Sequence, residues 1–488
     1  MLIDALKYQI LQQFGFVPTQ EQAHAVDTFA RFLTDTTPHV AMILRGSAGT
    51  GKTSLSGAIV RALKAVRQKV MLLAPTGRAA KVLALNSGYA AYTIHRRIYR
   101  EKTFAGVDGQ FNLNDNLYTD TLFMVDEASM IANLGLGTGN FGSGCLLDDL
   151  VHFVYQGTND RLLLIGDKAQ LPPVGEEESP ALSREMLEGY GLKVYECDLN
   201  EVLRQSQESG ILYNATVIRQ MVTHDDITQL PLVRFKGFAD IVMMPGNELV
   251  ESLSDSYYHQ GLDETIVITR SNKRANIYNN GIRNMVLDRE EELSGGDMLM
   301  IVKNNYFWTE KERNEVQKMK NVDQGNDIPA FLANGDRAKV LRVRRHTELY
   351  GFRFATLLLQ FPDYDNYEIS VTALLGTLQS DAPALTHEQQ EKLFLGVEED
   401  YQDVPLKADR MKAIRQDQYY NALQVKYAYA ITCHKAQGGQ WEHVYVDQGY
   451  MTDDMLTPDY IHWLYTAFTR AKGKLFLVNW PKTQTEQG

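Results

Sequence analysis

The residues from Gly46 to Thr53 read GSAGTGKT and combine glycine, lysine and threonine at a fixed spacing. They follow an apolar run at 40–44 and precede a helical stretch at 54–66. Glycines in such a loop let backbone N–H groups turn inward around phosphate oxygens, and the N-terminus of the following helix adds positive charge. Lys52 is then placed to reach the β- and γ-phosphates, and Thr53 is placed to ligate Mg²⁺. The pattern predicts a site for ATP with Mg²⁺, formed by Gly46, Ser47, Ala48, Gly49, Thr50, Gly51, Lys52, Thr53 and Ser54.

Two further segments carry polar side chains suited to the same chemistry. Asp126 and Glu127 follow the apolar run 122–125, and the carboxyl ends of parallel strands are where open α/β sheets bind ligands. Asp126 is expected to hold Mg²⁺, and Glu127 to polarise the water that attacks the γ-phosphate. The sequence GDKAQLPPVG follows the run 162–165, which places the Gln170 amide to sense the γ-phosphate. The double proline stiffens this loop, so a shift at Gln170 would be passed on.

The elements that must position these residues are short apolar runs without clean alternation, as expected for strands covered by helices on both faces. A first set occupies 40–44, 70–74, 122–125 and 162–165, and a second set occupies 266–268, 444–446 and 475–478. The sequence therefore predicts two α/β cores, one in each half of the chain. Residues 291–417 differ, because they hold alternating strands at 338–344 and 354–361 and a charged, partly helical segment at 388–403. They predict a β domain inserted into the second core.

The composition is that of a soluble globular protein, with 44% hydrophobic and 23% charged residues in a chain of 488. It excludes a mainly disordered chain, and no apolar run is long enough for a transmembrane helix. Apolar residues at helical spacing predict a helix over 1–14 instead of a signal peptide, so a cytoplasmic protein without membrane association is expected. Three distant cysteines give neither zinc spacing nor a disulfide frame. Five glycines within 133–147 predict a surface loop.

The net charge of −12, taken alone, argues against a nucleic-acid partner, because phosphate binding needs lysine and arginine. A local excess points the other way, since the chain carries ten basic residues and one acid between Arg61 and Lys102. A solvated helix face would also explain such a run. Because the run flanks the motifs described here, we favour a nucleic-acid-binding surface.

In their order along the chain the motifs resemble those of superfamily-1 DNA helicases of the B branch, which includes the RecD, Pif1 and Dda types. The resemblance spans 16–480 and rests on the segments FVPTQEQ (16–22), APTGRAA (74–80), TIH (93–95), VDEAS (125–129), GDKAQLPPVG (166–175), LNEVLRQ (199–205), ITRSNKRA (268–275), AITCHKAQG (430–438) and YTAFTRA (465–471). Ala436 and the compact chain favour the small Dda-like type. Gly439 and Gln440 stand where many relatives have an acid near the nucleotide sugar, so no ribose contact is assigned there.

The resemblance implies an α/β fold of two RecA-like parallel-sheet P-loop NTPase domains. A small hairpin is inserted in the first domain and an SH3-like β insertion in the second. The first domain would comprise 1–95 and 121–200, with a pin hairpin at 96–120. The second would comprise 201–290 and 418–488, with an SH3-like and tower insertion at 291–417.

The resemblance also implies roles for individual residues. Gln22 would read adenine and Gly438 would contact the nucleotide. Arg204 and Arg470 would join Lys52, Glu127 and Gln170 in catalysis by stabilising the transferring phosphoryl group, as arginine fingers do; the alternative for each arginine is a surface ion pair. The DNA contacts would be Pro75, Thr76, Arg78, Thr93, His95, Thr432 and His434, with Phe104 or Phe111 of the pin wedged against the last base pair. His95 and His434 could instead be satisfied core histidines, and Tyr92 and Tyr99 could stack on bases or pack in the core.

The implied activity is ATP-dependent movement in the 5′-to-3′ direction on single-stranded DNA, with unwinding of forked duplex DNA. The resemblance implies a monomer that acts in DNA replication, repair or recombination, with single-strand-binding, replication or recombination proteins as partners. Two alternatives remain open from the sequence. One is a RecD-like motor subunit of a nuclease or recombination complex, and the other is a nucleotide-switched binding protein without productive hydrolysis.

Overall fold

The computed structural model describes residues 2–101, 111–135, 142–202, 208–223, 229–318, 328–329 and 331–486. The chain divides into two compact units. The first comprises Met1–Met243, Ala436–Gln440 and Tyr450–Gly488, and the second comprises Met244–Lys435 and Trp441–Gly449. The chain therefore passes between the units four times.

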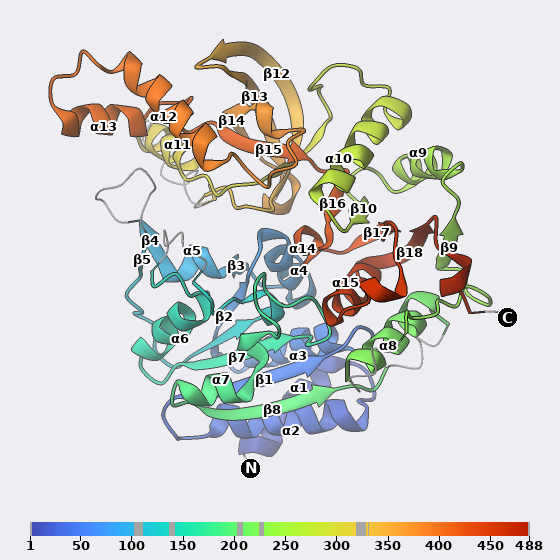
Figure 1. Ribbon diagram of the computed structural model, residues 1–488. Helices are drawn as coiled ribbons and strands as arrows, with labels where there is room; N and C mark the ends of the chain where they lie inside the picture. The colour runs from blue at the N-terminus through green and yellow to red at the C-terminus, as the bar shows by residue number, and fades with distance from the viewer. Residues whose placement is uncertain are drawn as a thin grey trace. The chain divides into compact units, whose positions relative to one another are not determined.

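The first unit is built on a six-stranded sheet in the order β3-β2-β6-β7-β1-β8 (Figure 1). Its strands are β1 (Val40–Gly46), β2 (Lys69–Ala74), β3 (Ala91–Thr93), β6 (Thr121–Val125), β7 (Arg161–Gly166) and β8 (Lys193–Leu199). Every neighbouring pair in this sheet is parallel. The predicted motifs follow β1, β2, β6 and β7, so the parallel order brings them to the same edge of the sheet.

Helices cover both faces of this sheet. The helices α1 (Leu2–Phe14), α2 (Gln20–Thr34) and α3 (Lys52–Ala65) share one buried cluster with Val40, Met42 and Leu44 of β1. On the opposite face Phe153 of α6 (Leu146–Gln156) meets Phe123 of β6 edge to face, with 5.8 Å between ring centroids. Because both faces are covered, the strands read as continuous apolar runs. The remaining sheet-flanking helices are α4 (Gly77–Ser87) and α7 (Arg184–Gly189).

A short hairpin leaves the first unit after α5 (Ile94–Ile98). It pairs β4 (Tyr99–Glu101) with β5 (Phe111–Leu113) in antiparallel register, inside the predicted pin at 96–120. The Tyr99 hydroxyl donates to Asp149 of α6 at 2.6 Å, which fixes the foot of the hairpin. Phe104 lies outside the described residues, and Phe111 is the first residue of β5.

The first unit also contains later parts of the chain. These are α8 (Gly210–Thr223), α15 (Pro458–Phe468), β18 (Ala471–Val478) and most of β9 (Ile241–Met244), which neighbours β18. Thr457 caps α15 by accepting the Tyr460 N–H at 3.2 Å, and Pro458 occupies its first turn, where a missing N–H costs nothing. Most side chains of α15 are buried, so this helix is a core element.

The second unit contains three parallel strands in the order β16-β10-β17. Their bounds are Thr265–Thr269 for β10, Ala430–Thr432 for β16 and Trp441–Asp447 for β17. The helices beside them are α9 (Leu249–His259) and α10 (Asn272–Gly281), and the short α14 (Cys433–Ala436) follows β16.

A closed five-stranded barrel forms the rest of the second unit, in the order β11-β12-β13-β14-β15. Its strands are β11 (Met298–Ile301), β12 (Arg337–Leu349), β13 (Phe352–Phe361), β14 (Tyr367–Leu374) and β15 (Leu423–Tyr427). The helix α11 (Phe307–Lys318) connects β11 to β12, and the pair α12 (His387–Asp400) and α13 (Lys407–Arg415) connects β14 to β15. The inserted β domain of the sequence analysis is this barrel, although its last strand follows residue 417.

A buried carboxyl group in the barrel makes its stability depend on pH. Burial raises the pKa of Asp336 to about 7, although Tyr364 Oη and Ala333 N donate to its Oδ2 at 2.8 and 2.7 Å. A raised carboxyl pKa means that the folded chain binds the proton more tightly than the unfolded chain, so stability falls as pH rises from about 4 to 7.

We expect Asp336→Asn to remove this loss, because an asparagine oxygen can keep both hydrogen bonds without the charge. The variant should be more stable than the wild type at pH 8, by roughly 2 kcal/mol, and by less than half of that at pH 5. Urea unfolding of both full chains at the two pH values measures this. An equal difference at both pH values would contradict it.

The expected α/β class, with parallel-sheet cores, a hairpin in the first half and a β insertion in the second, is confirmed. The helix over 1–14 and the predicted strands are present, with ends displaced by a few residues. One detail was wrong, because Leu146 and Leu147, assigned to the glycine-rich loop, already belong to α6. The domain boundaries remain a prediction, since the compact units follow packing and the boundaries follow the family pattern.

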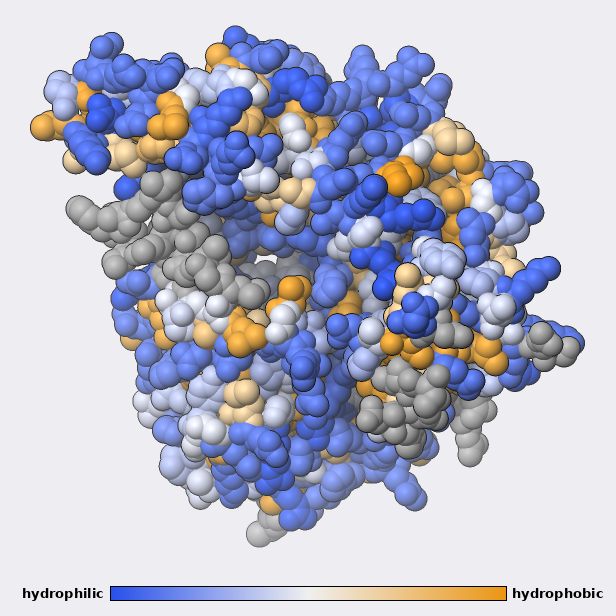
Figure 2. Space-filling view, viewed as in Figure 1, coloured by the Kyte–Doolittle hydropathy of each residue, from blue (hydrophilic) through white to orange (hydrophobic). Residues whose placement is uncertain are grey.

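Exposed hydrophobic side chains are scattered over the surface. The face in Figure 2 is mostly hydrophilic, and hydrophobic residues interrupt it in several separate places. Within the described ranges, no helix combines the length and apolar character needed to cross a membrane.

Candidate active site

The loop from Gly46 to Thr53 leaves β1 and enters α3 in the conformation that the glycines predict. Gly49 and Gly51 have φ of 79° and 76°, in the left-handed region that other residues rarely adopt. Gly51 is the N-cap of α3 and offers no side chain to cap it. The first N–H groups of the helix are therefore available to an anion.

Two side chains are anchored on the backbone of this loop. Lys52 Nζ donates to Gly46 O at 2.9 Å, which holds the ammonium within the loop. Gln22, 1% exposed, donates from Nε2 to Thr50 O at 2.9 Å and accepts the Thr19 N–H at 3.0 Å. The structure thus places Gln22 on the phosphate loop and on the cap of α2, and its predicted contact with adenine remains a prediction.

The two predicted acids lie directly after β6. Burial raises the pKa of Asp126 to about 6, with help from the Glu127 charge, while the Lys52 ammonium opposes the shift. Glu127 has a φ of 53°, a left-handed conformation that is unusual outside glycine and asparagine. Backbone strain at a residue whose side chain can take part in a reaction is typical of functional sites.

Three buried polar atoms near these strand ends lack a hydrogen-bond partner among the described residues: Glu127 Oε2, Ser129 Oγ and Gln170 Oε1. A buried acceptor without a partner costs about 1–3 kcal/mol, so each such atom calls for an explanation. Water and a magnesium nucleotide supply the donors and cations that carboxylate and amide oxygens bind. The residues therefore fit a nucleotide with Mg²⁺, with Lys52 facing the phosphates and Thr53 and Asp126 placed for the metal.

The loop that carries Gln170 is held on both sides. Leu171 N donates to Thr466 Oγ1 at 2.8 Å, and Gln437 Nε2 donates to Leu171 O at 2.6 Å. His462 Nδ1 lies 2.9 Å from Ala169 O. Side chains from three positions of the C-terminal part of the first unit therefore fix the backbone around Gln170.

Of the two predicted arginine fingers, only Arg470 is described; Arg204 lies outside the described residues. Arg470 is 2% exposed and donates to Thr466 O, Gly439 O and Thr469 Oγ1 at 3.0 to 3.1 Å. Among the described residues its guanidinium is held by two backbone carbonyls and a threonine hydroxyl instead of by an acid. Gly438, with φ of 71°, passes so close to α4 that a Cβ atom would lie 3.0 Å from Thr76 Oγ1.

Two residues at the phosphate loop were missed as site residues by the sequence analysis. Tyr465 Oη accepts the Ala48 N–H at 3.0 Å, and Arg219 of α8 donates to Ser47 Oγ. Tyr465 stands inside a quoted motif, so its position was a usable signal. Arg219 follows no recognised pattern, and only the packing of α8 brings it to the loop.

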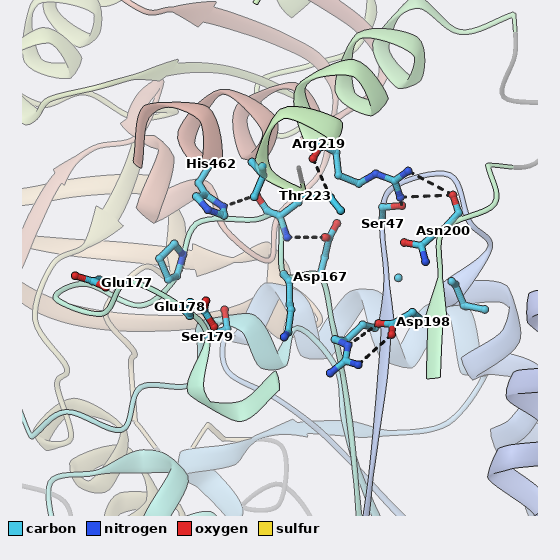
Figure 3. Close-up of a pocket in the computed structure, with 17 residues that line it drawn as sticks. Ser47, Asp167, Glu177, Glu178, Ser179, Asp198, Asn200, Arg219, Thr223 and His462 are labelled. Carbon is cyan, nitrogen blue, oxygen red and sulfur yellow. Dashed lines mark hydrogen bonds and ion pairs between the residues drawn. The ribbon is translucent and has the colours of Figure 1, made fainter. Parts of the chain in front are cut away.

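A cavity of about 410 Å³ opens beside the phosphate loop, within the first unit (Figure 3). Ser47, Asp167, Asn200, Arg219 and His462 line it, so it joins the loop after β1 to those after β7 and β8. A hydroxyl, a carboxylate, an amide, a guanidinium and an imidazole group therefore line one pocket.

The predicted DNA contacts of the first unit lie after β2 and β3. Thr76 and Thr93 cap α4 and α5 by accepting the Ala79 and Arg96 N–H groups at 3.2 and 3.3 Å. Arg78 donates to Gln440 O at 2.6 Å, and burial lowers the pKa of His95 to about 4, so His95 is neutral at pH 7. The fifth residue of this set, Pro75, follows β2 directly.

The aromatic residues of this region differ in their surroundings. The Arg97 guanidinium lies 3.7 Å from the centre of the Tyr92 ring, whereas the Tyr99 ring is buried and its hydroxyl is bound to Asp149. Tyr99 is therefore a packing residue.

The predicted DNA contacts of the second unit follow β16. Thr432 is half-buried and His434 is exposed. Next to them, burial lowers the pKa of Lys435 to about 8, and its ammonium donates to Asn334 Oδ1. A hydroxyl, an imidazole and an ammonium group thus occur within four residues at the end of one strand.

Comparisons with known proteins agree with this arrangement. The AAA domain family model matches residues 18–228, and the model of the UvrD-like helicase C-terminal domain matches residues 427–478. The first match contains the phosphate loop, Glu127 and Gln170, and the second contains Arg470. The chain therefore contains one region similar to the AAA domain family and a second region similar to the UvrD-like helicase C-terminal domain.

Individual relatives match different shares of the chain. It is 34% identical over 173 residues to an uncharacterised protein of Methanocaldococcus jannaschii, and 32% identical over 157 residues to the ATP-dependent RecD2 DNA helicase of Deinococcus radiodurans. These matches cover 33% and 32% of the chain but 14% and 18% of the relatives, so the chain spans less than a fifth of either. The Bacteroides Pif1 helicase in complex with ADP-AlF3 and single-stranded DNA aligns with 97% of this chain and 95% of its own, at 15% identity and a TM-score of 0.47.

Proposed function

We propose that the chain is an ATP-dependent DNA helicase that moves 5′-to-3′ on single-stranded DNA and unwinds duplex DNA ahead of it. The observation that carries the proposal is the pair of unpartnered buried oxygens, Glu127 Oε2 and Gln170 Oε1, at the ends of adjacent strands next to the phosphate loop. Glu127 Oε2 is suited to accept a proton from an attacking water, and Gln170 Oε1 can accept a hydrogen bond from water while the Gln170 amide NH2 group donates to the terminal phosphate.

Different residues are proposed to bind the phosphates, hold the metal, activate the water and stabilise the transition state. Lys52 and the N–H groups of the loop hold the phosphates of ATP, and Thr53 and Asp126 hold Mg²⁺, which neutralises phosphate charge when bound. Glu127 orients the water and takes its proton at the carboxylate. Arg470 and Arg204 are proposed to reach the terminal phosphate, where their charge would stabilise the transition state.

DNA binding is proposed for the residues that follow β2, β3 and β16. Hydroxyl and imidazole groups such as those of Thr76, Thr93 and His434 bind phosphate oxygens without reading bases. The proposed partners are single-stranded and forked DNA, with single-strand-binding or replication and recombination proteins, and the proposed state is a monomer. Sequence-independent contacts suit a motor that must pass over any sequence.

The test compares duplexes with a 5′ tail and with a 3′ tail, unwound by the purified chain with ATP and Mg²⁺, together with ATPase rates with and without oligothymidine. We expect DNA-stimulated hydrolysis and unwinding of the 5′-tailed duplex only. Unwinding from the 3′ tail would overturn the direction. Stimulated hydrolysis without unwinding of either duplex would favour a RecD-like motor subunit, and no hydrolysis would favour a nucleotide-switched binding protein.

A further inference from the structure

Tyr465 connects the phosphate loop to the loop that carries Gln170. Its Oη accepts the Ala48 N–H at 3.0 Å, and its O–H donates to Asp167 Oδ2 at 2.6 Å. The side chain is 1% exposed. Burial and the neighbouring Asp167 charge raise the pKa of Tyr465 well above its usual value, so the group remains a phenol that both accepts and donates.

The Ala48 N–H belongs to the loop whose backbone N–H groups bind phosphate oxygens in proteins with this motif. A single N–H group makes one strong, well-aligned hydrogen bond. A phosphate oxygen that takes the Ala48 N–H must therefore displace Tyr465 Oη.

Displacement of Tyr465 would change the position of the loop that carries Gln170. Asp167 accepts the Tyr465 hydroxyl on Oδ2 and the Ala169 N–H on Oδ1 at 3.0 Å. The neighbouring turn of α15 contributes His462 at Ala169 O and Thr466 at Leu171 N. A shift of α15 around Tyr465 thus moves the two residues that flank Gln170.

We propose that Tyr465 is a positioning residue that couples occupancy of the phosphate loop to the placement of Gln170. The Tyr465 hydroxyl accepts the Ala48 N–H until a phosphate oxygen takes its place as the acceptor. The released hydroxyl and α15 then change the position of the Asp167–Leu171 loop. This proposal rests on the proposed ATP site and adds a route by which binding prepares hydrolysis.

The test is Tyr465→Phe, which keeps the ring and removes Oη. Without Oη the half-buried Ala48 N–H loses its protein acceptor until nucleotide binds, so a fluorescent non-hydrolysable ATP analogue should bind about fivefold more tightly. Turnover should fall severalfold, because Asp167 loses its donor. A residue with a merely structural role would weaken binding and turnover together.

Two variants serve as controls. Thr466→Val loosens Leu171 but does not touch the phosphate loop, so it should lower turnover without tightening nucleotide binding. Tyr445→Phe removes another buried hydroxyl, which is bound to Ser252 and Ser256, and should change neither quantity.

Equal or weaker binding of the analogue by Tyr465→Phe, with a wild type that binds it, would overturn the coupling alone. No binding by the wild type would overturn the ATP site and the coupling with it. If Tyr465→Phe does not fold, amide hydrogen exchange of the wild type, measured with and without the analogue, tests the coupling instead. The coupling requires the analogue to change exchange at the Ala169 and Leu171 amides, and unchanged exchange there would overturn it.

Discussion

Lys52→Ala is expected to lower the DNA-stimulated ATPase rate by about 10²–10³-fold and to abolish unwinding. Lys52 is the cation of the phosphate loop, where it donates to Gly46 O at 2.9 Å. Removing one charged donor from a preorganised site costs roughly 3–4 kcal/mol of transition-state stabilisation. Steady-state hydrolysis with saturating oligothymidine measures the effect.

Lys64→Ala is the matched control, because Lys64 lies on the same helix but places its ammonium over the Tyr89 ring, 5.3 Å from the ring centre. It should hydrolyse ATP at nearly the wild-type rate. A Lys52→Ala protein that folds and retains more than about a tenth of the wild-type rate would be incompatible with a phosphate-binding role for this loop.

Glu127→Gln should lower turnover by about 10²–10⁴-fold, the usual contribution of a general base, while nucleotide and DNA still bind. Glutamine has nearly the same shape as glutamate, so the left-handed φ of 53° and the half-buried position should be kept. What is lost is the carboxylate, whose oxygen Oε2 is the proposed acceptor of the proton from the attacking water. Single-turnover hydrolysis, with binding of a fluorescent ATP analogue in parallel, separates these effects.

Glu177→Gln provides the comparison for this substitution, since Glu177 lines the cavity beside the phosphate loop and is exposed. Its turnover should match the wild type. If Glu127→Gln turned over as fast as Glu177→Gln, the proton would have to leave through another group, and the assignment of Glu127 would fail.

The site was predictable from the sequence where chemistry and strand ends coincide. Lys52, Glu127 and Gln170 each follow a short apolar run, and parallel strands must bring their carboxyl ends to one edge. The glycine spacing predicted a loop whose N–H groups turn inward, and the structure realises that loop with left-handed turns at Gly49 and Gly51. These features depend on residues close in sequence.

What depends on distant residues could not be predicted in the same way. The strand β8, KVYECDL, was missed because acidic residues interrupt its apolar positions. Its Asp198 is accommodated because Arg45 of the neighbouring strand β1 donates to it at 2.5 Å, a contact that the sequence does not reveal. Arg219 reaches Ser47 only through the packing of α8. Gln22 was assigned to adenine from its motif, yet its amide is bound to Thr50 and Thr19, which the motif does not reveal.

The four passages of the chain between its two units have a consequence for protein dissection. A protease that cuts one linker leaves two fragments that both contribute to the first unit, so packing and not a covalent bond would hold them together. Expression of the first 243 residues alone omits 436–440 and 450–488. Such a fragment would keep the whole parallel sheet and the glycine turn. It would lose the tyrosine and threonine acceptors that Ala48 and Leu171 use. Truncation of this chain at its apparent midpoint should therefore give an incomplete phosphate-loop pocket and not an autonomous half.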